Sequence, residues 1–184
     1  MTKRRLINLI VTIIGVIIIT YVWPWVQAKF ESHPVVPVGQ YAVTKTVDGD
    51  TIEVNMGGVN EKVRMIGVDT PETHKPNTPV QCYGPEASDY TKSQLSGKSV
   101  RLEADPLDDN RDRYGRLLRY IYVDNVLYNK RLIELGYGFA YISFPFTKKV
   151  EFMQAQFDAS GKKIGLWAAC QPTSDGGRWQ SNNL

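Results

Sequence analysis

The feature that most restricts how this chain can fold is a run of 23 residues without a charged side chain, residues 6–28. The run is rich in Ile, Val and Leu. At 1.5 Å per residue, a helix of this length would cross a hydrocarbon core about 30 Å thick. Basic residues at positions 3–5 precede it, which favours a cytoplasmic N-terminus. The pattern therefore predicts a transmembrane signal anchor at residues 1–28, with the remainder of the chain on the extracytoplasmic side.

A cleaved secretory signal is the alternative for this segment. The apolar part of such a signal usually holds about 7–15 residues and precedes a small-residue cleavage site. Residues 26–28, Val-Gln-Ala, are a poor but possible site. Under this alternative the mature chain would be secreted.

Charge outside the apolar segment is balanced. The chain carries 22 Lys and Arg against 19 Asp and Glu, and the three basic residues at positions 3–5 account for the whole excess. The sequence pI of about 8.8 therefore gives no support by itself for a nucleic-acid partner. Any such conclusion has to rest on the positions of particular charged residues.

The chain of 184 residues has room for one globular domain and its attachments. A linker that contains two prolines and a glycine is expected at residues 29–39, and the domain at residues 40–170. Alternating apolar and polar residues predict five strands, at residues 41–47, 51–55, 62–68, 99–104 and 117–123. A closed barrel leaves no open edge, so an OB-type barrel is the natural candidate, although several other small barrels fit five strands equally.

Three helices are expected with these strands, which makes the fold class α+β. The sequence Gly84-Pro85-Glu86 opens the first helix, and Gly136 ends the second. The third begins near residue 147, and its periodicity predicts one apolar face. Three residues define that face: Val150, Met153 and Phe157.

The only two cysteines of the chain are Cys82 and Cys170. An even number in an exported chain permits one disulfide bond, and two unrelated buried thiols are the alternative. A bond would close a loop of roughly ninety residues and stabilise the fold by about 4–5 kcal/mol in the chain-entropy model. The polar residues 171–184 that follow are expected to be a flexible tail.

Polar residues concentrate where strands should end. Asp48-Gly49-Asp50 places two carboxylates at a tight turn, which by itself explains Asp48. Alternation puts Arg64 on the same face as two apolar residues, and a guanidinium on an apolar face needs an anionic partner. A third concentration, residues 111–119, holds four arginines and a tyrosine.

These residue types fit hydrolysis of a phosphodiester bond. Asp50, Asp69 and Thr70 offer the oxygen ligands that a hard cation prefers, and the sequence has no His or Cys cluster that would suggest zinc. Two arginines could bind the negative charge that develops in the transition state. Glu72 is close enough in sequence to the expected ligands to deprotonate the attacking water.

Four motifs, in order and spacing, resemble the staphylococcal nuclease (thermonuclease) family over about residues 40–168. The motifs are Val47-Asp48-Gly49-Asp50-Thr51, Val63-Arg64 with Asp69-Thr70-Pro71-Glu72-Thr73, Tyr83-Gly84-Pro85-Glu86-Ala87, and Asp112-Arg113-Tyr114-Gly115-Arg116. The resemblance implies an OB-fold barrel with three helices. It also implies a Ca²⁺-dependent nuclease that cleaves DNA and RNA to 3′-phosphate products.

The resemblance implies a role for nine residues. Calcium ligands are implied at Asp50, Asp69 and the carbonyl oxygen of Thr70, and the general base at Glu72. A phosphate-binding pair is implied at Arg64 and Arg116. Contacts with the nucleotide are implied at Arg113, Tyr114 and Tyr141, and Tyr141 could equally be a core aromatic residue.

Two other functions agree with parts of the sequence. OB barrels often bind oligonucleotides without cleaving them, so a membrane-tethered binding module is one alternative. A membrane-tethered adaptor that uses its polar tail as a contact segment is the other. The five side chains expected for the chemistry are all present, and a pure binder does not need this set. We therefore expect an extracytoplasmic, monomeric nuclease that acts on DNA and RNA.

Overall fold

The computed structural model describes residues 3–17, 20–21, 39–73 and 79–184. The chain divides into two compact units, residues 1–35 and 36–184. The first contains helix α1 (Lys3–Ile17), and residues 22–28 of the predicted anchor and 29–38 of the predicted linker lie outside the described ranges. Within these ranges, no helix is both long enough and apolar enough to cross a membrane.

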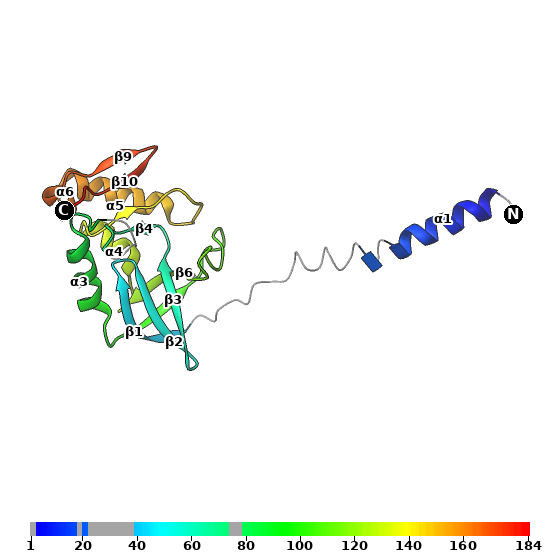
Figure 1. Cartoon of the computed structure of the whole chain (residues 1–184), viewed down its shortest axis with the longest axis horizontal. Coiled ribbons are helices and arrows are strands. Elements are labelled where there is room, and N and C mark those ends of the chain that lie inside the picture. The colour runs from blue at the N-terminus through cyan, green and yellow to red at the C-terminus, as the bar shows by residue number, and fades with distance from the viewer. Residues whose placement is uncertain (1–2, 18–19, 22–38, 74–78) are drawn as a thin grey trace. The chain divides into compact units, whose positions relative to one another are not determined.

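The second unit is built around a closed barrel of five strands (Figure 1). Its strands are β1 (Gln40–Asp48), β2 (Thr51–Met56), β3 (Val59–Met65), β5 (Ser99–Glu103) and β6 (Leu117–Val123), and the short β7 (Val126–Leu127) extends the sheet. Antiparallel neighbours run in the order β3-β2-β1-β5-β6, and a parallel pairing of β3 with β6 closes the circle. The predicted α+β class and five-stranded barrel are confirmed.

Apolar side chains from every barrel strand fill its interior. The residues with no exposed surface include Ile52, Val54, Val63, Val100, Leu117 and Ile121. One buried polar side chain, Asn129 of helix α4 (Tyr128–Glu134), links this helix to the barrel. Its amide oxygen accepts from Ile121 N at 2.8 Å, and its amide nitrogen donates to the carbonyl of Ile66 at 2.9 Å. The amide therefore satisfies backbone groups that the strands leave unpaired.

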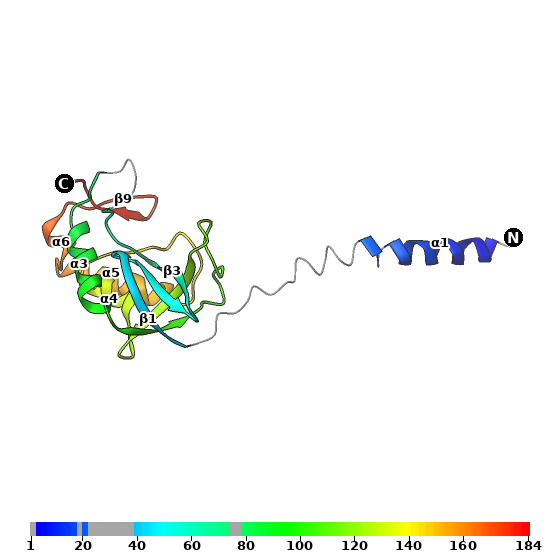
Figure 2. The ribbon, with the colours of Figure 1, turned by 60° about the horizontal axis from the view of Figure 1, so that its bottom comes forward.

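Helix α3 (Gly84–Leu95), α4 and helix α5 (Lys149–Gly161) are the three predicted helices, and the short α6 (Leu166–Ala169) follows them (Figure 2). The prediction that Val150, Met153 and Phe157 form the packing face of α5 is wrong. Val150 and Phe157 are 80% and 72% exposed, and Met153 is also exposed. The helix instead buries Phe152, Ala155 and Ala159. Periodicity favoured the larger apolar residues, whereas packing selected the small alanines beside one phenylalanine.

The strand predicted over residues 62–68 is interrupted. Strand β3 ends at Met65, and the short β4 (Val68–Asp69) begins after a turn at Gly67, which has φ +72°. A Cβ atom at this glycine would lie 2.8 Å from the ring of Phe146, so the turn requires glycine on two grounds. Strand β4 then pairs with β8 (Phe139–Ala140) and leaves the barrel.

The C-terminal residues correct the expectation of a flexible tail. Strands β9 (Thr173–Asp175) and β10 (Arg178–Gln180) form an antiparallel hairpin, drawn in red beside α6 in Figure 1. The indole of Trp179 packs edge-on against that of Trp167, with ring centroids 5.0 Å apart. Polar composition suggested disorder, but this tryptophan gives the hairpin an apolar anchor.

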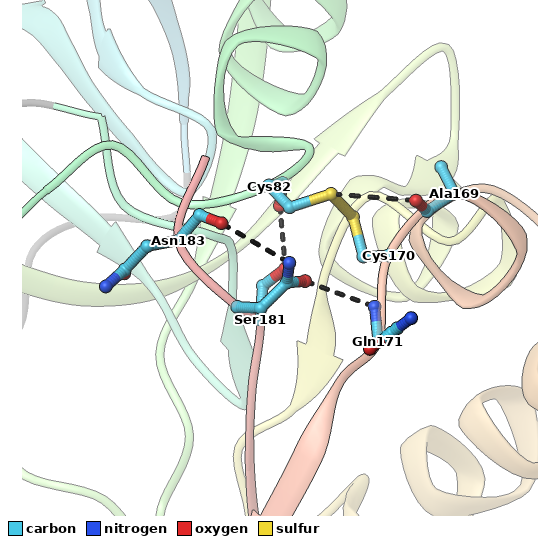
Figure 3. The surroundings of a disulfide bond; sticks show 7 residues. Cys82, Ala169, Cys170, Gln171, Ser181 and Asn183 are labelled. Carbon is cyan, nitrogen blue, oxygen red and sulfur yellow. Dashed lines mark hydrogen bonds between the residues drawn. A yellow bond between two sulfur atoms is a disulfide. The ribbon is translucent and has the colours of Figure 1, made fainter.

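A disulfide bond and a set of hydrogen bonds fix both ends of the hairpin (Figure 3). Cys82 and Cys170 are bonded, with Cα atoms 5.9 Å apart, so the predicted pairing is confirmed. Ser181 Oγ donates to the carbonyl of Cys82 at 2.8 Å, and Cys82 N donates to the carbonyl of Asn182 at 2.7 Å. Residues 181–184 are thus held against residues 80–82, which precede α3.

Candidate active site

The tight turn between β1 and β2 meets the end of β4 at one end of the barrel. Asp50 Oδ2 accepts two hydrogen bonds from Thr70, one from its backbone N–H at 2.9 Å and one from its hydroxyl at 3.1 Å. A Cβ atom at Gly49 would lie 2.7 Å from Thr70 Oγ1, so glycine is needed for this close approach. The two segments that the sequence predicted to carry oxygen ligands are therefore in direct contact.

Arg64, near the end of β3, lies between the two aspartates. Its guanidinium contacts Asp50 Oδ2 at 3.0 Å and Asp69 Oδ1 at 2.9 Å, and it donates to the carbonyl of Val68 at 2.7 Å. Burial opposes the charged form, but the surrounding carboxylates outweigh it and raise the pKa of Arg64. The anionic partner expected for this arginine is confirmed, and it consists of two carboxylates.

Asp48 belongs to the site, although the sequence reasoning gave it no role there. Its carboxylate accepts from the backbone N–H of Gly49 at 2.8 Å, as the turn demands, and also from Thr73 Oγ1 at 3.0 Å. Burial, then the charge of Asp50, and further a hydrogen bond with Glu72 raise its pKa to about 7. The spacing of two aspartates around one glycine was the available signal, and the turn alone had been sufficient to explain it.

Glu72 is brought to the same end of the barrel through this contact with Asp48. Its backbone N–H donates to Gln81 Oε1 at 2.8 Å, and its own Oε1 accepts from the N–H of Thr73 at 3.2 Å. These bonds fix the direction of the segment that follows β4. Glu72 therefore belongs to the cluster in which the sequence placed it.

The cluster carries more negative than positive charge. The carboxyl groups of Asp48, Asp50 and Asp69 act on the Arg64 guanidinium, Glu72 contacts Asp48, and Arg178 contacts Asp69. Burial raises the pKa of Asp69 in spite of Arg64. A hard cation such as Ca²⁺ would supply the missing positive charge, and the donors are all oxygen atoms. Among the described residues, no three His, Cys, Asp or Glu side chains are placed to hold a metal. Asp50 and Asp69 would need the carbonyl of Thr70 and water to complete a ligand set.

Arg116 lies on a separate loop. The same loop carries Arg113 and Tyr114, for which the resemblance implies contacts with the nucleotide. Asp112 accepts from Arg116 Nε at 2.7 Å and from the backbone N–H groups of Tyr114 and Arg116. Burial alone would raise the pKa of Asp112, but these hydrogen bonds lower it. Asp112 therefore folds the loop and orients Arg116. Nothing in the described part of the chain joins Arg116 directly to Asp50 or Asp69.

Arg113 and Tyr114 form an exposed pair on this loop. Arg113 donates to the Tyr114 hydroxyl at 2.8 Å, its guanidinium lies 4.9 Å from the ring centroid, and the tyrosine is 68% exposed. An exposed ring with cations above it is suited to stacking against a base. The other two arginines of the segment are structural, because Arg111 binds Glu61 through two hydrogen bonds and Arg119 is buried against Asn110.

Tyr141 faces the site and not the core. It is half-buried, its backbone N–H donates to the carbonyl of Gly67 at 2.9 Å, and its side chain influences the pKa of Arg64. The guanidinium of Arg178, on the C-terminal hairpin, lies 5.2 Å from the ring centroid. Of the two interpretations of Tyr141, this position agrees with a contact to the substrate.

Comparison with known proteins gives consistent matches. Residues 62–169 match the family model described as "Staphylococcal nuclease homologue". The thermonuclease of Staphylococcus hyicus is 38% identical over 176 residues, which cover 90% of this chain and 99% of that protein. The thermonuclease of Staphylococcus intermedius is 44% identical over 128 residues, 69% of this chain and 75% of that one. The SPbeta prophage-derived endonuclease YokF of Bacillus subtilis is 40% identical over 126 residues, 67% of this chain and 42% of that one.

Proposed function

Because the chain belongs to the staphylococcal nuclease family, we propose that it is a calcium-dependent nuclease that hydrolyses DNA and RNA to 3′-phosphate products. The observation that carries the proposal is the cluster around Arg64, in which Asp50 and Asp69 share one guanidinium. A buried cation held by two carboxylates, with Glu72 alongside, is more than an oligonucleotide-binding barrel requires. The cluster supports catalysis over binding alone.

Asp50, Asp69 and the carbonyl of Thr70 are the groups that would hold calcium. When bound, the ion would offset the carboxylate charge and polarise the phosphoryl group. Glu72 would accept a proton from the water that attacks phosphorus, and Asp48 would hold the Glu72 carboxylate in place. With its raised pKa, Asp48 in its protonated form is able to donate a hydrogen bond to the Glu72 side chain.

Two arginines would stabilise the charge that develops at phosphorus. Arg64 already lies among the candidate ligands, and the Asp112 carboxylate orients Arg116 on its own loop. Planar guanidinium groups bind phosphate oxygens through two parallel hydrogen bonds, and preorganised donors of this kind are strongest when they match the transition state. Arg113, Tyr114 and Tyr141 would contact the nucleotide outside the reacting group.

The products of a labelled oligonucleotide test this proposal. Purified chain in calcium should shorten single-stranded DNA and RNA of the same sequence, and the new ends should carry a 3′-phosphate. A 3′-end assay with and without a phosphatase distinguishes these ends from 3′-hydroxyl groups. A retarded complex that forms without shortening would identify a binding module and refute the nuclease.

For the cellular location, we propose that residues 6–28 tether the domain on the extracytoplasmic face of the membrane. The support is the length of the uncharged run and its basic flank. Protease added to intact cells should degrade the domain and leave a cytoplasmic control protein whole. Mature chain in the medium that begins near residue 29 would instead show a cleaved signal, and a domain protected from protease would refute the topology.

A further inference from the structure

The C-terminal hairpin brings a second arginine, Arg178, to the carboxylate of Asp69. Arg178 Nη2 lies 3.3 Å from Asp69 Oδ2, and Arg64 Nη2 lies 2.9 Å from the other oxygen, Oδ1. One carboxylate therefore lies between two guanidinium groups that come from β3 and from β10. The family model ends at residue 169, so the second guanidinium comes from a segment outside the matched region.

The direction of Arg178 is fixed by the fold of the hairpin. Alternate residues of a strand point to opposite faces, so the burial of Trp179 against Trp167 turns Arg178 the other way. The disulfide bond holds the first end of the hairpin, and the hydrogen bonds of Ser181 and Asn182 with Cys82 hold the second. Arg178 is therefore presented by an anchored element and not by a loose terminus.

The surroundings of Arg178 suit a ligand with negative charge. Its side chain is 49% exposed, compared with 13% for that of Arg64, and its guanidinium lies 5.2 Å from the Tyr141 ring. A guanidinium has five N–H donors, and the contact with one oxygen of Asp69 leaves donors for a second anion. Arg64 alone already provides a close, buried partner for Asp69, so structural pairing does not require Arg178.

We propose that Arg178 binds a phosphate of the nucleic-acid substrate, so that the C-terminal hairpin forms one wall of the substrate site. This inference rests on the proposed function, because the phosphate that Arg178 would bind belongs to the nucleic acid that the candidate active site would cleave. The phosphate would lie next to the group that Arg64 binds, because both arginines contact one carboxylate. The Tyr141 ring would lie beneath the Arg178 guanidinium as a stacking surface.

The salt dependence of DNA binding tests the proposal. Binding of a fluorescently labelled single-stranded DNA oligonucleotide is measured with the full chain in mild detergent, on the Glu72→Gln background to limit cleavage. The measurement is made with calcium and again with EGTA. Arg178→Ala should weaken binding about tenfold at low salt. The negative slope of log K against log salt should become less steep by about 0.7, the value for one phosphate contact on a single strand.

Three variants serve as controls. Arg178→Lys keeps the charge and should restore the slope. Gln180→Ala alters an uncharged neighbour on the same strand, and Lys98→Ala removes a cation that pairs with Asp124 away from the cluster. Both should leave the slope unchanged. Tryptophan fluorescence of each variant, compared with that of the parent, reports whether Trp167 and Trp179 are still packed, because Trp23 and Trp25 are common to all the chains.

The two levels of the proposal can fail separately. Normal cleavage by the parent chain together with an unchanged salt slope in Arg178→Ala would overturn the role of Arg178 and leave the nuclease intact. A parent chain that neither binds nor cleaves nucleic acid would overturn the proposed function and this inference with it. Loss of binding by Arg178→Ala with a displaced hairpin and no rescue by Arg178→Lys would show a structural role instead.

Discussion

Replacement of Glu72 by glutamine is expected to lower turnover by about 10²–10⁴-fold while DNA affinity stays nearly constant. The amide cannot accept the proton of the attacking water, yet it has the same shape as the carboxylate. Gln81 holds the backbone N–H of this residue, and the amide oxygen of a glutamine can still accept from the N–H of Thr73, so the substitution should leave the segment in place. Single-turnover cleavage and oligonucleotide affinity, measured side by side, separate the two quantities.

Glu86→Gln is a matched control, because Glu86 is an exposed acid in the first turn of α3. It should keep both turnover and affinity close to those of the parent. If Glu72→Gln weakened DNA affinity as much as it slowed cleavage, Glu72 would be a structural acid and the general base would have to be sought elsewhere in the cluster.

Removal of the disulfide bond is expected to cause the largest loss of stability of any change considered. The bond joins cysteines 88 positions apart, and the chain-entropy model gives about 4–5 kcal/mol for a loop of this length. Cys82→Ser combined with Cys170→Ser removes both thiols, so that no free cysteine can form new pairs. Equilibrium unfolding in guanidinium chloride of residues 36–184, which contain the whole barrel core, measures the change.

The parent protein under reducing conditions provides the control. It should unfold at the same denaturant concentration as the double serine variant under oxidising conditions, since both lack the crosslink. An unchanged midpoint in the double variant would show that the folded chain gains nothing from the bond. Its role would then be confined to holding the start of the C-terminal hairpin.

The barrel could be predicted because its strands follow a simple rule. Alternating apolar residues and turn signals located β1, β2, β5 and β6 to within two residues. With the third predicted strand they made a small closed barrel the natural candidate, although strand count alone fitted several kinds of barrel. Alternation failed where one glycine decided the backbone. Gly67 divides the predicted third strand into β3 and β4, and its fit against Phe146 depends on tertiary packing.

The sequence predicted which residues belong to the candidate site better than it predicted how they are arranged. Arg64 among apolar residues required an anion, and that argument located a buried ion pair correctly. The part played by Asp48 could not be read from the sequence, because its turn was a sufficient reason for an aspartate. Arg178 was assigned to a flexible tail on composition. The contact that anchors its hairpin joins Trp167 and Trp179, and no local sequence pattern indicates that pair.

The most direct test of the account is DNA cleavage by the purified chain in EGTA, followed by addition of a single metal. Every donor in the candidate site is an oxygen atom, and the cluster around Arg64 is rich in carboxylates. We expect EGTA to abolish cleavage and excess calcium to restore it, whereas zinc should not restore it. Undiminished cleavage in EGTA would contradict the assignment of Asp50, Asp69 and Thr70 as the groups that hold a catalytic metal.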